Sequence, residues 1–247
     1  MTEFGLLLEA GAVAFTDGDR AVMNALTMRR ALSYASNFDA LIVQHAMDQD
    51  LQSAGVMHEG ELATRLGLTG IPVAAETAII DRDIRLVELT GARYHIHQIS
   101  SRESVEAVRQ AKARGLAVSC GVSAAHLMLN ENDVENYRTF AKLNPPLRSE
   151  DDRLALVDGL ADGTIDIVVS GHNPQDAEAK RQPFAQAAYG TVGVETLLSV
   201  LLSLHHAHGL DLATLIRTVT RNPARLLNID GGTLRAGCLL YTSDAAD

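Results

Sequence analysis

Two histidines in the segment Tyr94–Ile99 have the spacing of a metal-binding pair. His95 and His97 are two residues apart in a stretch with the composition of a β-strand, so we expect their side chains to lie on one face of that strand. Zinc is bound by imidazole nitrogens presented in this way. A structural histidine is the more common case for a bare pair, and the spacing alone leaves both interpretations open.

Other side chains that can bind a metal or move a proton also follow strand-like segments. Asp48 and His45 come after the apolar residues 40–44, and His126 and His172 follow two later segments of the same kind. Asp48 can serve as a metal ligand or a base, but aspartate in this position is also a common helix cap. No glycine-rich phosphate loop, GxSxG turn or HExxH helix is present, which removes the reactions that depend on those motifs.

Short apolar segments alternate with amphipathic ones along the chain. We predict five or six strands with helices between them, an order typical of a parallel sheet covered by helices. The strand that begins at Ile165 ends abruptly at Ser170-Gly171-His172-Asn173-Pro174-Gln175. It has the form of an active-site strand of an α/β barrel, yet it offers no carboxylate before Asp176. The expected strands are 10–16, 40–44, 94–99, 116–121 and 165–169.

Composition limits the classes of protein to consider. The chain has 247 residues, 47% of them hydrophobic, which is enough for one large α/β domain. A net charge of -10 argues against nucleic acid as a partner. The two cysteines, Cys120 and Cys238, fit neither a disulfide framework nor a paired-cysteine metal site, so we expect a cytoplasmic protein. The apolar residues 192–204 are interrupted by Glu195 and too short for a membrane span.

From Ala10 to about Gly237 the order of segments resembles the bacterial dihydroorotases of the amidohydrolase superfamily. The resemblance implies a (β/α)₈ TIM barrel of the metal-dependent hydrolase type, with a metal centre at the C-terminal ends of its strands. It also implies reversible hydrolysis of the cyclic amide dihydroorotate to N-carbamoyl-aspartate in pyrimidine biosynthesis. The segments that carry the resemblance are EAGAVAFTDG, QHAMDQDL, HEGELATRLGLTGIPVAAET, HIHQISSRESVEAVRQAKARG, KLNPPLRSEDDR, DGTIDIVVSGHNPQ, YGTVGVET and TRNPARLLNI.

Position by position, the resemblance to the family is partial. His97 stands at a metal-binding histidine, Asp48 at a metal-associated aspartate, and Asn144 at an asparagine that contacts the substrate. Ala125, however, stands at a metal-binding histidine, and Gly171 at the catalytic aspartate of the family's DHAPH motif. Alanine offers no donor atom to a metal and glycine cannot transfer a proton. We therefore expect no catalytic residue at that strand, and a zinc centre that is lost or weak.

The two ends of the chain also depart from the family pattern. The family's first-strand HxH pair and its C-terminal β-domain have no counterpart here. We therefore expect residues 1–237 to form an incomplete barrel that lacks its first strands, and residues 238–247 to form a tail unlike the family.

Three functions follow from the resemblance. The first is that of the family's non-catalytic homologues, which act as structural or regulatory companions of aspartate carbamoyltransferase, with a homo-oligomer as a further state. The second is an active zinc-dependent dihydroorotase or related cyclic amidase that uses replacement groups such as His126, His172 and Asp176. The third is a binding module that keeps a ligand pocket without the reaction.

Overall fold

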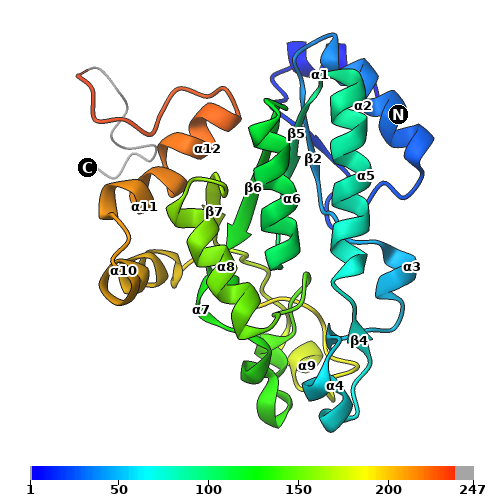
Figure 1. Ribbon diagram of the computed structural model, residues 1–247, viewed down its shortest axis with the longest axis vertical. Coiled ribbons are helices and arrows are strands. Elements are labelled where there is room, and N and C mark those ends of the chain that lie inside the picture. The colour runs from blue at the N-terminus through cyan, green and yellow to red at the C-terminus, as the bar shows by residue number, and fades with distance from the viewer. Residues whose placement is uncertain (1, 237–247) are drawn as a thin grey trace.

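A computed structural model of the chain describes residues 2–236, and its centre is a sheet of five parallel strands (Figure 1). The strand order is β1-β2-β5-β6-β7, and every pairing is parallel. The predicted α/β class with a parallel sheet is confirmed. The strands are β1 (Phe15–Thr16), β2 (Leu41–Gln44), β5 (Arg93–Ile96), β6 (Val118–Ser123) and β7 (Ile167–Val169). A separate two-stranded sheet pairs β3 (Met57–His58) with β4 (Gly70–Ile71).

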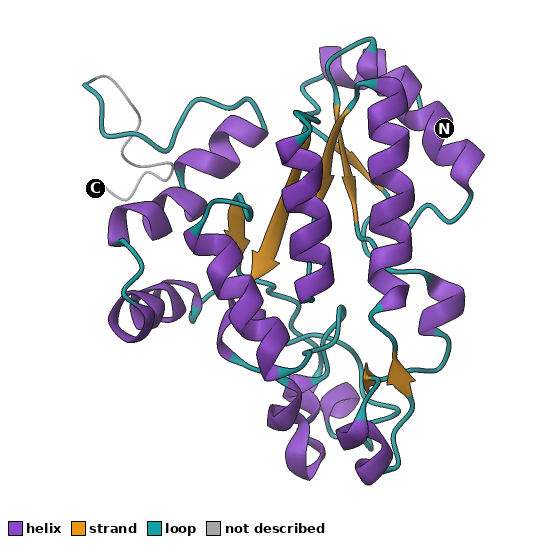
Figure 2. Ribbon diagram, viewed as in Figure 1, coloured by secondary structure: helices purple, strands orange, loops and turns teal. Residues whose placement is uncertain are grey.

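Helices α2, α5, α6 and α8 stand side by side along the sheet, each packed on the next (Figures 1 and 2). Helices α10, α11 and α12 lie beyond β7, at the opposite side from the N-terminus (Figure 1). None of the helices within residues 2–236 is long and apolar enough to cross a membrane. The helices are α1 (Phe4–Glu9), α2 (Ala25–Ser36), α3 (Gln49–Gln52), α4 (Glu61–Leu66), α5 (Ala74–Thr90), α6 (Arg102–Ala113), α7 (Ala124–Met128), α8 (Glu150–Ala161), α9 (Ala177–Lys180), α10 (Leu197–His208), α11 (Leu212–Val219) and α12 (Arg221–Leu226), with 3₁₀ turns η1 (Glu131–Tyr137) and η2 (Thr139–Ala141).

Local sequence explains where the main helices begin. The Ser101 hydroxyl accepts a hydrogen bond from the Ser104 backbone N–H at the start of α6. Ser149 caps α8 in the same way, and the Asp152 side chain completes the capping box. These caps satisfy backbone N–H groups that have no partner within the helix. At the other end of α5, Gly91 takes the left-handed conformation (φ 65°) that terminates a helix at little steric cost.

The register of the parallel strands separates the two faces of the sheet. Ile42, Tyr94 and Val118 are paired across β2, β5 and β6 and lie in the main hydrophobic core with the helices. Val43 and His95 are likewise paired in register, one position further along, and so lie on the opposite face. Because side chains alternate along each strand, one set points into the core between the sheet and the helices. The other set points to the opposite face of the sheet.

The N-terminal region differs from the prediction. The strand expected at 10–16 is reduced to β1, and helix α1 precedes it. The Phe4 ring stacks on Phe15 at a centroid separation of 4.2 Å and on Tyr34 at 5.2 Å. This aromatic packing, which joins residues far apart in sequence, stabilises a helix that local patterning does not indicate. The tail predicted at 238–247 lies outside the described residues.

A buried carboxylate ties α5 to the sheet. Asp83 is fully buried and accepts hydrogen bonds from the Tyr94 hydroxyl (2.7 Å), the Gln44 amide (3.3 Å) and the Arg82 guanidinium (2.8 Å). Arg82 in turn donates to the backbone carbonyls of Val22 and Met23. One helix, two strands and the segment before α2 are thus fixed to each other by a single buried side chain.

We predict that Tyr94→Phe destabilises the fold, because Asp83 then loses a donor while it stays buried. Hydrogen bonds to charged groups are worth about 1.5 to 3 kcal/mol, and urea unfolding measures the loss. The control is Tyr137→Phe, which removes an exposed hydroxyl bonded to the Leu66 carbonyl. An equal decrease in the free energy of unfolding in the two variants would contradict the role assigned to Asp83.

Candidate active-site cavity

A cavity of about 400 Å³ opens at the C-terminal ends of the five parallel strands. Each strand delivers a side chain or a turn to its lining: Asp19 follows β1, His45 follows β2, Gln98 follows β5, Ser123 ends β6 and Gly171 follows β7. Carboxyl ends of parallel strands meet at one edge of a sheet, which is where α/β barrels carry their chemistry. The position of this cavity therefore makes it the candidate active site.

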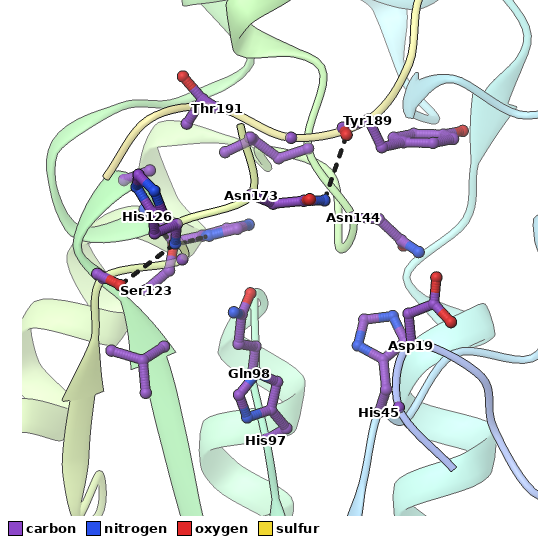
Figure 3. Close-up of a pocket in the computed structure, with 18 residues that line it drawn as sticks. Asp19, His45, His97, Gln98, Ser123, His126, Asn144, Asn173, Tyr189 and Thr191 are labelled. Atoms are coloured by element: carbon purple, nitrogen blue, oxygen red, sulfur yellow. Dashed lines mark hydrogen bonds between the residues drawn. The ribbon is translucent and has the colours of Figure 1, made fainter. Parts of the chain in front are cut away.

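One wall of the cavity holds two buried polar atoms without partners. His45 is 5% exposed, and its Nε2 atom makes no hydrogen bond, nor does the Oδ1 atom of Asn144. Figure 3 shows Asp19, His45 and Asn144 together on this side. Burial lowers the pKa of His45, although the negative charges of Glu76 and Asp19 and the Asn144 side chain oppose the shift. The imidazole is therefore neutral and has a free ring nitrogen in the cavity wall.

The predicted histidine pair is divided between two environments. His97, which lines the cavity, lies just beyond the end of β5, and its backbone N–H donates to the Gln44 carbonyl (2.9 Å). His95 lies within β5, is 2% exposed and shares a hydrogen bond with the Ser119 hydroxyl through Nδ1 (2.8 Å). Burial, with a smaller effect of His97, lowers the pKa of His95 to about 3. Only His97 of the two therefore faces the cavity.

His126 is held by hydrogen bonds at both ring nitrogens. Nε2 lies 3.1 Å from the Pro145 carbonyl oxygen and Nδ1 lies 2.7 Å from the Ser123 hydroxyl. A carbonyl can only accept, so Nε2 carries the proton and Nδ1 accepts from the hydroxyl. Burial lowers the pKa of His126, which agrees with this neutral form. The ring is used to join the end of β6 to the 145–146 segment and offers no free nitrogen to a metal or a proton.

Gly171 occupies a backbone conformation that restricts what can replace it. Its φ is +61°, and a Cβ atom added there would lie 3.0 Å from the Ser123 Cβ. The neighbouring His172 accepts hydrogen bonds at Nδ1 from the backbone N–H groups of Gly193 (3.2 Å) and Val194 (3.3 Å). The turn after β7 is thus shaped around a glycine and a histidine that is bonded to the backbone.

Asp48 takes a structural role at the start of α3. Its Oδ1 atom accepts hydrogen bonds from the backbone N–H groups of Asp50 and Leu51, both at 3.0 Å. Asp48 is not among the residues that line the cavity. The helix-cap interpretation describes this geometry, and the metal-ligand assignment stays a prediction.

Two buried lysines hold a loop over the cavity. Lys180 donates to the carbonyls of Thr139 and Ala188, both at 2.8 Å, and Lys142 donates to the Ala185 carbonyl at 3.0 Å. Burial lowers the pKa of both ammonium groups. The loop fixed in this way brings Tyr189 to the cavity, where its carbonyl accepts from the Asn173 amide (3.3 Å; Figure 3). This loop therefore contributes to the lining at the strand ends.

A buried pair of opposite charges lies next to the cavity. Arg148 is 2% exposed and donates to the Ile71 carbonyl (2.7 Å) and the Ser100 hydroxyl (3.1 Å), and the same hydroxyl donates to the fully buried Glu76. Burial, with the nearby Arg148 charge, lowers the pKa of His58 to about 4. This network fixes the segments that follow β4 and β5 and the turn that carries Asn144.

The donor set does not form a metal site on its own. Asp19, His45 and His97 line the same cavity, but no three His, Cys, Asp or Glu side chains among residues 2–236 are grouped closely enough to hold a metal ion. The zinc that the resemblance implies therefore does not fit the described donor set. Neither Asp19 nor Gln98 stands out in the sequence by residue type, and the one signal for them is that each comes shortly after a strand.

Solved hydantoinase structures have a fold similar to that of this chain. The L-hydantoinase (dihydropyrimidinase) of Arthrobacter aurescens superposes with a TM-score of 0.81 at 25% identity, over 96% of this chain and 56% of that one. The dihydropyrimidinase of Brevibacillus agri gives 0.81 at 20% identity, over 95% and 54%. The second likeness supports the fold alone. The chain therefore shares the fold of hydantoinases over about half of their length.

Sequence relatives identify the family more narrowly than the fold does. Residues 1–104 match the family model described as dihydro-orotase-like. The dihydroorotase of Ehrlichia canis is 44% identical over 96% of this chain and 53% of its own length, and that of Anaeromyxobacter dehalogenans is 46% identical over 96% and 55%. The chain therefore belongs to the dihydroorotase family, as predicted. It spans about half the length of the curated relatives it matches.

We predict that the folded chain loses stability between pH 7 and pH 5. An unfolded histidine titrates near pH 6.5, whereas folded His95 titrates at about 3. Between these two pH values the unfolded chain binds more protons than the folded chain. The free energy of unfolding is therefore largest above pH 6.5 and decreases as the pH is lowered. His95 alone accounts for about 1 to 2 kcal/mol of the difference.

Urea unfolding at the two pH values measures this effect. His95→Gln should reduce the pH dependence, whereas His206→Gln, at an exposed position at the end of α10, should leave it unchanged. A pH dependence that is the same in both variants and the parent chain would contradict the assignment.

Proposed function

We propose that this chain is a dihydroorotase-like protein of pyrimidine biosynthesis that does not hydrolyse dihydroorotate and acts as a structural or regulatory companion of aspartate carbamoyltransferase. Membership of the dihydroorotase family supports the assignment to pyrimidine biosynthesis. The companion role rests on the resemblance to non-catalytic homologues. Cytoplasmic localisation and a homo-oligomeric state belong to the same proposal.

The turn after β7 carries the argument against catalysis. Gly171 stands at the catalytic aspartate of the family motif, and no side chain there can take or give a proton. Ala125 stands at a metal-binding histidine, and both ring nitrogens of the adjacent His126 are engaged with Ser123 and Pro145. A single replacement does not supply both missing groups. Loss of an essential acid, base or ligand costs orders of magnitude in rate.

The same proposal includes an incomplete barrel over residues 1–237. Five parallel strands form the main sheet of residues 2–236, whereas a closed barrel of this type has eight. β1 and β7 lie at the two edges of the sheet order.

The companion role needs a surface for the partner. Leu198 and Leu202 on α10 are 54% and 37% exposed, and Leu212 and Ile216 on the adjacent α11 are each 37% exposed. On each of these two packed helices the two exposed apolar side chains are about one turn apart, and exposed apolar surface of this kind can mark a protein interface. We assign the contact with the carbamoyltransferase to this α10–α11 patch.

Co-expression with aspartate carbamoyltransferase tests this role. We predict one complex in size-exclusion chromatography, and its dissociation by Leu198→Glu, which places a charge in the patch. Leu26→Glu on α2 is the control, since Leu26 is also exposed (52%) but lies elsewhere. Two independent species for the parent chain would refute the companion role, and equal effects of the two variants would refute the assigned surface.

We predict that Gly171→Asp alone gives no hydrolysis of dihydroorotate, because Ala125 remains. The left-handed φ and the 3.0 Å approach to Ser123 should also lower stability, by about 1 kcal/mol. Gly171→Ala is the control, because it has the steric effect without the carboxylate. Substantial hydrolysis by Gly171→Asp would show that the metal-binding residues are still functional.

An active zinc-dependent dihydroorotase or related cyclic amidase is the alternative. Its support is that Asp19, His45 and His97 line one cavity and that His45 Nε2 has no partner. It requires these groups to approach one another, with His172 or Asp176 as replacement groups. The described donor set does not provide that arrangement, so the non-catalytic role is the better supported one.

A further inference from the structure

A second pocket, of about 270 Å³, lies outside the cavity at the strand ends. Its lining comes from α7, from the 3₁₀ turns η1 and η2, from residues 191–192 and from the start of α10, and we call it the α7–α10 pocket. Ala125 and Thr191 line both this pocket and the strand-end cavity, so the two hollows lie back to back. None of the other residues that line the α7–α10 pocket lines the strand-end cavity.

Apolar side chains make up most of the wall of the α7–α10 pocket. Met128, Phe140 and Val192 are 52%, 59% and 46% exposed, although each is a large apolar side chain. Leu129 and Val200 complete the same wall and are partly buried. Exposed apolar side chains gathered around a concave site are typical of a site that a ligand covers. The body of such a ligand is therefore apolar.

One cation in the lining has no partner. The side chain of Arg138, between η1 and η2, makes no hydrogen bond or ion pair with the rest of residues 2–236. Asp133 is the one acidic residue that lines the pocket, and its carboxylate accepts a hydrogen bond from the Asn130 backbone N–H (3.0 Å). A second cation lies nearby, because the Lys180 ammonium is 5.7 Å from the centre of the Phe140 ring. The free guanidinium can therefore receive an anion.

We propose that the α7–α10 pocket binds a short aliphatic carboxylate. The alkyl chain packs against the apolar wall, and the carboxylate accepts two parallel hydrogen bonds from the Arg138 guanidinium, the geometry that this group favours. The volume of about 270 Å³ is just below the usual range of small-molecule sites, which begins at about 300 Å³, so one short chain fits. This proposal goes beyond the companion role and does not depend on it.

Calorimetry of the 247-residue chain with octanoate and with octylammonium tests the class of ligand. The two probes have the same alkyl chain and opposite charges. We expect octanoate to bind at one site and at least tenfold more tightly than octylammonium, because only octanoate can accept from Arg138. Equal or tighter binding of octylammonium, or no binding of octanoate, would overturn the proposal.

Loss of the free cation tests the assigned contact. Arg138→Gln should weaken octanoate binding at least tenfold, since it removes the charge from an exposed side chain without disturbing a contact within the fold. Arg65→Gln on α4 is the matched control, because Arg65 is also exposed and has no side-chain partner among residues 2–236. Equal binding of octanoate by the two variants would overturn the proposal.

A bulky side chain tests the location of the site. Val192→Trp should fill the pocket and weaken octanoate binding at least tenfold, whereas Val194→Trp should not change it. Both valines are exposed and lie in the same segment, but only Val192 lines the pocket. An unchanged thermal melt shows that each variant is folded, and if Val192→Trp does not fold, Arg138→Gln decides alone. Unaltered binding in folded Val192→Trp would overturn the proposal.

Discussion

The buried pairing of Arg148 with Glu76 is the interaction on which the cavity depends. The two groups approach to 4.0 Å and are joined more closely through the Ser100 hydroxyl. Arg148 ends the segment that carries Asn144 and Pro145, and Pro145 in turn holds His126. An uncompensated buried charge is strongly destabilising, so neither partner can be lost alone. The pair therefore keeps the strand-following segments in place whether or not a reaction occurs between them.

The arrangement of the site is separable from its chemistry. Strand ends, the covering loop and the buried charge pair all serve to position residues around one cavity, and they depend on hydrogen bonds and packing. A reaction depends on a few additional atoms at that cavity, and Gly171 and Ala125 provide neither a carboxylate nor an imidazole. The dihydroorotase family can thus include a chain that retains the sheet and the pocket with a different polar lining.

Much of the architecture is predictable from the sequence, because strand and helix segments differ in local pattern. The strands at 40–44 and 165–169 and the helix starts at Ser101 and Ser149 follow from apolar runs and caps. Helix α1 does not, since contacts of Phe4 with Phe15 and Tyr34 decide it. The site is harder to predict from the sequence, because the tertiary fold decides which side chains lie close together. Spacing cannot tell that Asp19 and Gln98 line one cavity together with His45, or that Asp48 caps a helix and does not line that cavity.

Hydrolysis of dihydroorotate by the purified chain, measured with and without stoichiometric zinc, decides whether this cavity is catalytic. We predict no turnover above that of buffer in either condition and less than one tightly bound zinc per chain. Turnover that requires zinc, and that is abolished by His45→Ala in a chain that still melts cooperatively, would show instead that the cavity lining forms a working metal centre.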